Sequence, residues 1–166
     1  MKPIRDWSAC QQIKCFGEDY SGFLRQPPEY VFTHGACHAF ALELRDLLKQ
    51  NNTTEPKLYL ITNGPLPVCE GVVVDAPIVR HVFVLTSSDG IDINGIQHAS
   101  RFLEDWRKAP DDISEELVFE DWLTKPSPSG GMQSVVGLRA DSSFLSEARK
   151  LAAKIIQGNP GKFGVM

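Results

Sequence analysis

An apolar stripe along residues 37–48 restricts the fold of this 166-residue chain more than any other feature. Its members recur every three or four residues, which is the spacing of one face of an α-helix: Cys37, Phe40, Ala41, Leu44, Leu47 and Leu48. Polar residues such as Glu43 and Arg45 occupy the other side, and residues 51–54 form a turn sequence. The pattern predicts an amphipathic helix that begins near Cys37 and packs against a second layer.

Strand patterns follow this helix and supply the second layer. Residues 57–62 and residues 81–86 are rich in large apolar and β-branched side chains. The turn sequence Ser87-Ser88-Asp89-Gly90 separates the second strand from residues 91–94, which predicts a β-hairpin. Because hairpin strands run antiparallel, we expect an antiparallel sheet and an α+β fold class.

Helical patterns return in the C-terminal part, about residues 97–158. Residues 98–107 and residues 142–157 each carry an apolar stripe and are expected to form helices that flank the sheet. Residues 113–123 fit either a helix or a strand. Residues 26–29 predict a turn or an extended segment, because their two prolines fix φ and lack backbone donors.

Length and charge restrict the class of protein. A chain of this length fits one domain, residues 1–166, with a core large enough to fold without disulfides. The net charge of −4 argues against a nucleic-acid partner, which requires a basic surface. No apolar run is long enough to span a bilayer, so we expect no membrane partner. Residues 1–7 lack the apolar core of a signal peptide, which favours a cytoplasmic location.

The chain contains four cysteines, at positions 10, 15, 37 and 69. In a cytoplasmic protein of this size, cysteines serve catalysis or metal binding more often than disulfides. Cys37 differs from the others because it stands at the predicted start of a helix. Unpaired backbone N–H groups and the helix dipole favour a thiolate there, and the same N–H groups can hold an oxyanion. Gly35 allows the chain to turn sharply just before this helix.

Two further residues complete a candidate catalytic set with Cys37. His81 lies at the start of one predicted hairpin strand, and Asp92 lies on the other. An acid in this place can orient the imidazole, and the imidazole can activate the thiol. The turn sequence places His81 opposite Asn94 to Ile96, so Asn94 competes with Asp92 for the third role.

The order and setting of these residues resemble the papain-like cysteine enzyme superfamily, most nearly its transglutaminase-like branch. The resembling segments are residues 34–41, residues 81–84 and residues 92–95, within a core of about residues 33–96. The resemblance implies a helix headed by the catalytic Cys and packed on an antiparallel sheet. It also implies Cys37 as nucleophile, His81 as base and Asp92 as orienting group. Transglutaminases have a Trp beside the Cys and another after the His, and this chain has neither.

The first functional hypothesis is therefore a cysteine-dependent hydrolase or acyl transferase without a cofactor. Such an enzyme cleaves or transfers an amide or acyl group of a peptide, a protein or a small amide through a thioester acyl-enzyme. Cysteine peptidases, deamidases and transglutaminases share these steps.

Two alternatives stay open. One is a catalytically inactive papain-like module that binds a partner. The other is a zinc-stabilised domain with ligands among His34, Cys37, His38 and Cys69. Against all three hypotheses, we weigh ordinary structural roles. Cys37 can be a core cysteine, Asp92 can face solvent or stabilise the following turn at Asn94-Gly95, and Trp106 can be a core anchor. His98 can be exposed, and His38 can be exposed or lie on the substrate side of the site.

Overall fold

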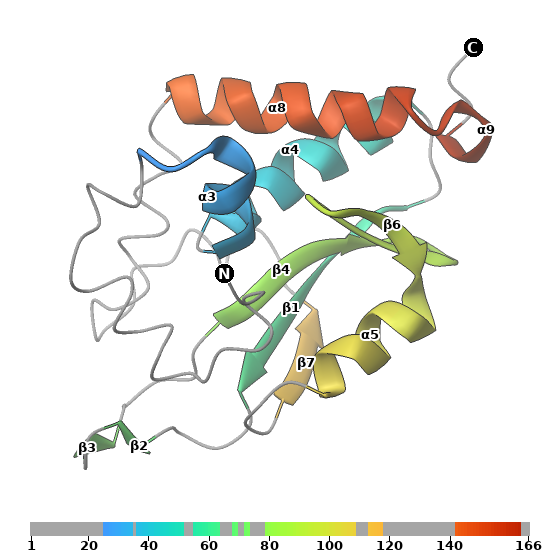
Figure 1. Cartoon of the computed structure of the whole chain (residues 1–166). Helices are drawn as coiled ribbons and strands as arrows, with labels where there is room; N and C mark the ends of the chain where they lie inside the picture. The colour runs from blue at the N-terminus through green and yellow to red at the C-terminus, as the bar shows by residue number, and fades with distance from the viewer. Residues whose placement is uncertain are drawn as a thin grey trace.

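The computed structural model describes residues 25–34, 36–51, 55–63, 68–69, 72–73, 79–108, 113–117 and 142–163. These residues form a mixed α+β fold, as expected. The helices α4 (Cys37–Gln50) and α8 (Ser142–Gln157) cover one side of an antiparallel sheet, and α5 (Ala99–Arg107) lies on the other side (Figure 1). Helix α3 (Pro28–His34) packs beside the start of α4, and the short α9 (Pro160–Phe163) follows α8.

Helix α4 begins at Cys37, as the apolar stripe predicts. Its buried residues include Phe40, Leu44 and Leu48 from that stripe. The Nδ2 group of Asn51 donates a hydrogen bond to the carbonyl oxygen of Leu47 at 2.9 Å, so the helix ends at the first residue of the predicted turn sequence. One residue of the polar side departs from expectation, since Arg45 is buried and bonds to the Asp46 carboxylate at 2.7 Å.

The main sheet has the strand order β6-β5-β4-β1-β7, and every neighbouring pair is antiparallel. Its central strands are those that the sequence predicts, with slightly different ends. They are β1 (Lys57–Asn63), β4 (Val79–Leu85) and β5 (Asp89–Asp92), and the register pairs Val84 with Ile91. The two edges are β6 (Gly95–His98) and β7 (Ile113–Leu117); β2 (Val68–Cys69) pairs separately with β3 (Val72–Val73).

The expected strand over residues 91–94 is wrong at its end. Strand β5 stops at Asp92, and Ile93 and Asn94 form a two-residue turn into β6. Gly95, which pairs with Asp92, has a φ of 120°, a conformation that glycine adopts without strain. The four residues of β6 therefore separate this turn from α5, which corresponds to the helix predicted for residues 98–107.

Two other expectations need correction. Pro28 begins α3 rather than continuing an extended segment, because a proline suits the first turn of a helix, where its missing donor is not needed. The C-terminal part, about residues 97–158, is not purely helical. Within it, residues 113–117 form β7, whose pairing with β1 aligns Leu117 with Tyr59.

Strand alternation divides the core between the two faces of the sheet. Val82 and Val84 of β4 face the layer of α4 and α8, while Phe83 packs with Phe102 and Trp106 of α5. Trp106 is buried and is a core anchor, as predicted. Within the described segments, no helix is both long and apolar enough to cross a bilayer.

Candidate functional site

His81 is the centre of the candidate site. It lies on β4 with only 1% of its surface exposed. Its Nε2 atom lies 3.0 Å from Oδ2 of Asp92, and this hydrogen bond is buried. Its ring stacks on Trp106, with 4.8 Å between ring centroids and 18° between planes. Phe83 and Phe102 stack on it more distantly, each at 6.1 Å. The imidazole is thus held in one orientation by a carboxylate and by aromatic rings.

The geometry of the hairpin brings Asp92 to His81. The β4–β5 ladder pairs Leu85 with Gly90 and Val84 with Ile91, and it records no pair beyond Ile91. Continued register would place Asp92 opposite Phe83, on the face that His81 shares. The Asp92 carboxylate therefore reaches His81 diagonally across the strands, at the point where the ladder ends. It is 7% exposed.

Asn94 contacts Asp92 rather than His81. Its backbone N–H donates to Asp92 Oδ1 at 2.8 Å, and its Nδ2 group donates to Asp92 Oδ2 at 3.2 Å. Extended register does place Asn94 opposite His81, as the sequence indicates, but the chain has already entered the turn. Of the two competitors for the third position, the structure thus brings Asp92 into contact with His81 and Asn94 into contact with Asp92.

Cys37 is the first residue of α4 and carries a free thiol that is 8% exposed. Ala36 precedes it as the N-cap, and its carbonyl oxygen accepts from the backbone N–H groups of Ala39 and Phe40 at 3.0 and 3.4 Å. Among the described residues, no side chain caps this helix end. The thiol therefore lies beside first-turn N–H groups that can stabilise negative charge.

The charge state of His81 depends on both neighbours. Burial lowers the pKa of His81, but the hydrogen bond to Asp92 and the interaction with Cys37 outweigh it and raise the pKa from 6.5 to about 9. The Cys37 thiol makes no hydrogen bond of good geometry to Nδ1, which is buried without a partner in the described part of the chain. Because Nε2 is bonded to Asp92, Nδ1 is the ring nitrogen that is left for a second partner.

The other candidate residues take different places. His38 is buried rather than exposed, and it lies on a helix that contacts α3, α8 and β4. His98 is exposed at the start of α5, as predicted, and its Nδ1 lies 2.9 Å from Ser100 Oγ.

The zinc alternative depends partly on residues that the structure does not describe. The side chains of His34 and Cys69 lie outside the described residues, as do Cys10 and Cys15. Within the described part, no three His, Cys, Asp or Glu side chains are arranged to hold a metal ion.

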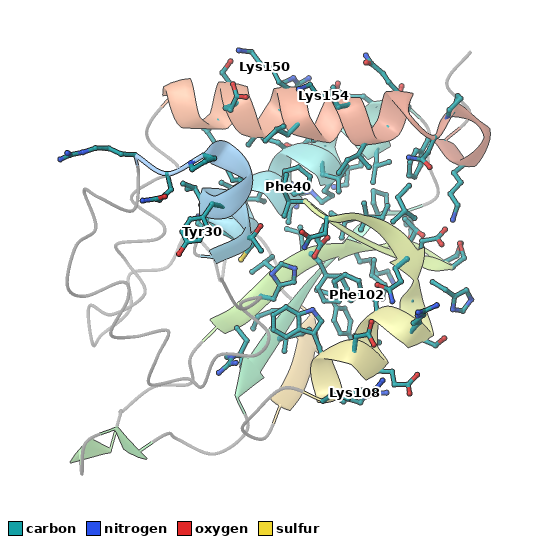
Figure 2. The ribbon with its side chains drawn as sticks, in the orientation of Figure 1. Tyr30, Phe40, Phe102, Lys108, Lys150 and Lys154 are labelled. Atoms are coloured by element: carbon teal, nitrogen blue, oxygen red, sulfur yellow. The ribbon has the colours of Figure 1, made fainter. Side chains whose placement is uncertain are left out.

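Sequence reasoning missed two contributions to the site. The first is the stacking of Trp106 and Phe102 on His81, which needs the placement of α5 across the sheet; Figure 2 shows Phe102 directed from α5 toward the sheet. The second is the support that Asn94 gives to Asp92. Its signal is the sequence Asp92-Ile93-Asn94-Gly95, in which an Asp begins a turn and a Gly ends it.

Comparisons with known proteins add no assignment. The chain matches no protein-family model, and neither curated proteins nor solved structures include a significant match.

Proposed function

We propose that this chain is a cysteine-dependent hydrolase or acyl transferase with a papain-like core, acting on an amide or acyl bond through a thioester acyl-enzyme. The observation that carries the proposal is the buried hydrogen bond of 3.0 Å between His81 and Asp92, on a histidine that also interacts with the helix-heading Cys37. Thiol catalysis requires a nucleophile, a base and an acid that orients the base, and Cys37, His81 and Asp92 can fill these three roles.

The proposed reaction begins with a proton transfer from Cys37 Sγ to His81 Nδ1. The imidazolium that forms donates through Nε2–H to Asp92, whose negative charge stabilises it. The raised pKa of His81 favours this charged form of the ring, which supports transfer of the thiol proton to it. The stacked Trp106 ring adds cation–π stabilisation of the imidazolium.

The thiolate sulfur then attacks the carbonyl carbon of the substrate. The negative charge that develops on the carbonyl oxygen is held by the Cys37 N–H and one more donor. His81 returns its proton to the departing amine or other leaving group, which leaves a thioester on Cys37. Water or an amine attacks this thioester, and the product acid or new amide is released with the thiol restored.

The substrate that this chemistry suits is a peptide, a protein or a small amide. Peptidases, deamidases and transglutaminases differ in the leaving group and in the nucleophile that attacks the thioester, while the same three catalytic roles serve each of them.

The test is the detection of the acyl-enzyme. The protein is incubated with p-nitrophenyl acetate, and acetylated peptides are mapped by mass spectrometry. We expect acetylation of Cys37 in preference to the other three cysteines, and its loss in Cys37→Ala. A Cys69→Ala variant is the matched control and should keep the reaction. Equal acetylation of all four cysteines, or none at Cys37, would overturn the proposal and favour a non-enzymatic binding module.

A further inference from the structure

We propose that Asn94 is a positioning residue, which holds the Asp92 carboxylate in the orientation that bonds His81. The inference rests on the proposed function and adds a fourth residue to its machinery. The Nδ2 group of Asn94 donates to Asp92 Oδ2 at 3.2 Å, and the same oxygen lies 3.0 Å from His81 Nε2. Asn94 thus acts on the histidine through the acid.

The turn itself does not require this side chain. The hydrogen bond that closes the turn runs from the Asn94 backbone N–H to Asp92 Oδ1 at 2.8 Å. Any residue except proline supplies that N–H group. The side-chain amide adds a separate hydrogen bond, directed to the other carboxylate oxygen. This second bond has no part in reversing the chain, so it points to a role at the site.

The Asp92 carboxylate needs such support because of its place in the fold. It lies at the last residue of β5, where the β4–β5 ladder records no further pair. The terminal torsion of an aspartate is soft and permits a broad range of rotation. Donors on both oxygens, from His81 and from the two groups of Asn94, restrict that rotation. Since Asp92 is 7% exposed, little solvent is available to replace a lost donor.

A fixed carboxylate matters for the chemistry of His81. It keeps the proton on Nε2 and leaves Nδ1 as the atom that exchanges a proton with Cys37. If the carboxylate rotates, the His81–Asp92 hydrogen bond is formed for a smaller fraction of the time. The imidazolium is then less favoured, and the thiol is activated less often.

The experiment compares two variants of Asn94 with a matched control. Asn94→Ala keeps the backbone N–H and removes the side-chain donor. Asn94→Asp keeps the shape and the turn preference but replaces the donor with an acceptor. Ser88→Ala is the control, because Ser88 Oγ makes a similar bond of 2.8 Å to Asp89 Oδ2 in the preceding turn of the same hairpin. The measurements are the NMR titration of His81, the alkylation rate of Cys37 with iodoacetamide and the melting temperature.

We expect Cys37 alkylation near neutral pH to slow by about tenfold in both Asn94 variants, which is the factor that corresponds to the loss of one hydrogen bond. The pKa of His81 should fall toward its usual value in Asn94→Ala, while Ser88→Ala matches the wild type in both readouts. A purely structural Asn94 would give an Asn94→Asp variant with wild-type alkylation, and that result overturns the inference.

The two proposals fail in different ways. If Cys37 of the wild type reacts no faster than the other cysteines, the proposed function fails, and the His81 titration of Asn94→Ala still decides the role of Asn94. If wild-type Cys37 is selectively reactive and both Asn94 variants behave like it, only the role of Asn94 is overturned.

Discussion

Trp106 and His81 lie face to face across the interface of α5 with the sheet, with ring centroids 4.8 Å apart and planes inclined by 18°. A Trp face attracts a cation, so this stacking favours the imidazolium form of His81. The hydrogen bond between His81 and Asp92 is itself buried. The helix that follows the hairpin therefore forms part of the surroundings of His81 on β4.

Replacement of Trp106 should lower the pKa of His81. In Trp106→Leu the cation–π contribution of about 0.5–1 kcal/mol is lost, which corresponds to a fall of about half a pKa unit. Trp106→Phe retains an aromatic face and should show a smaller fall. The measurement is an NMR titration, with the His81 signal assigned by its absence in His81→Gln. An unchanged titration in Trp106→Leu would show that the stacking has no electrostatic effect.

Gly90 links the packing of the hairpin to the site. A Cβ added there would lie 2.9 Å from Cγ of Phe102, which itself stacks on His81. Gly90→Ala should therefore cost about 1–3 kcal/mol of unfolding free energy through overpacking. Gly161→Ala is the control, since its added Cβ meets no described atom within 4 Å apart from its own neighbouring residues and helix backbone. Urea unfolding measures both, and equal stability of the two variants would refute the close packing of Gly90 on Phe102.

The raised pKa of His81 predicts how stability varies with pH. The folded chain binds a proton at His81 up to about pH 9, whereas the unfolded chain releases it near 6.5. The contribution is thus complete below about pH 6.5 and is lost as the pH rises through about 9. Unfolding free energies measured by urea across this range should fall with pH in the wild type.

Two variants isolate this contribution from other titrations. Asp92→Asn removes the charge that raises the pKa of His81, so its slope against pH should be shallower. His98→Gln changes an exposed histidine away from the site and should keep the wild-type slope. Identical slopes for the wild type and Asp92→Asn would mean that the His81–Asp92 pair does not contribute to stability.

The elements of the fold with strong local patterns could be predicted from the sequence. The apolar patterns of the sequence predict the helix α4 and the strands β1 and β4. Strand β6 could not be recognised, because its pairing with β5 depends on the turn at Ile93 and Asn94 rather than on its own residues. The helix that begins at Pro28 was missed because its local sequence is ambiguous: a proline occurs in loops as well as in the first turn of a helix.

For the candidate site too, local patterns predict some features, and the other features depend on turns and on packing between distant segments. The helix start identified Cys37, and the hairpin identified His81 with an acid near it. The choice between Asp92 and Asn94 depends on where β5 ends, which is a property of the turn and not of the strand pattern. The aromatic stack on His81 depends on packing across the sheet, which no local pattern contains.

The most direct test of the central claim is the pH dependence of Cys37 alkylation. In a background with Cys10, Cys15 and Cys69 replaced by serine, iodoacetamide reports on Cys37 alone. An ordinary thiol with a pKa of about 8.5 is almost fully protonated at about pH 6 and reacts slowly there. If His81 and Asp92 activate Cys37, the wild type should react at about pH 6 at least about tenfold faster than His81→Gln, with Asp92→Asn between them. Equal rates and the same pH profile in all three proteins would contradict the proposed catalytic triad.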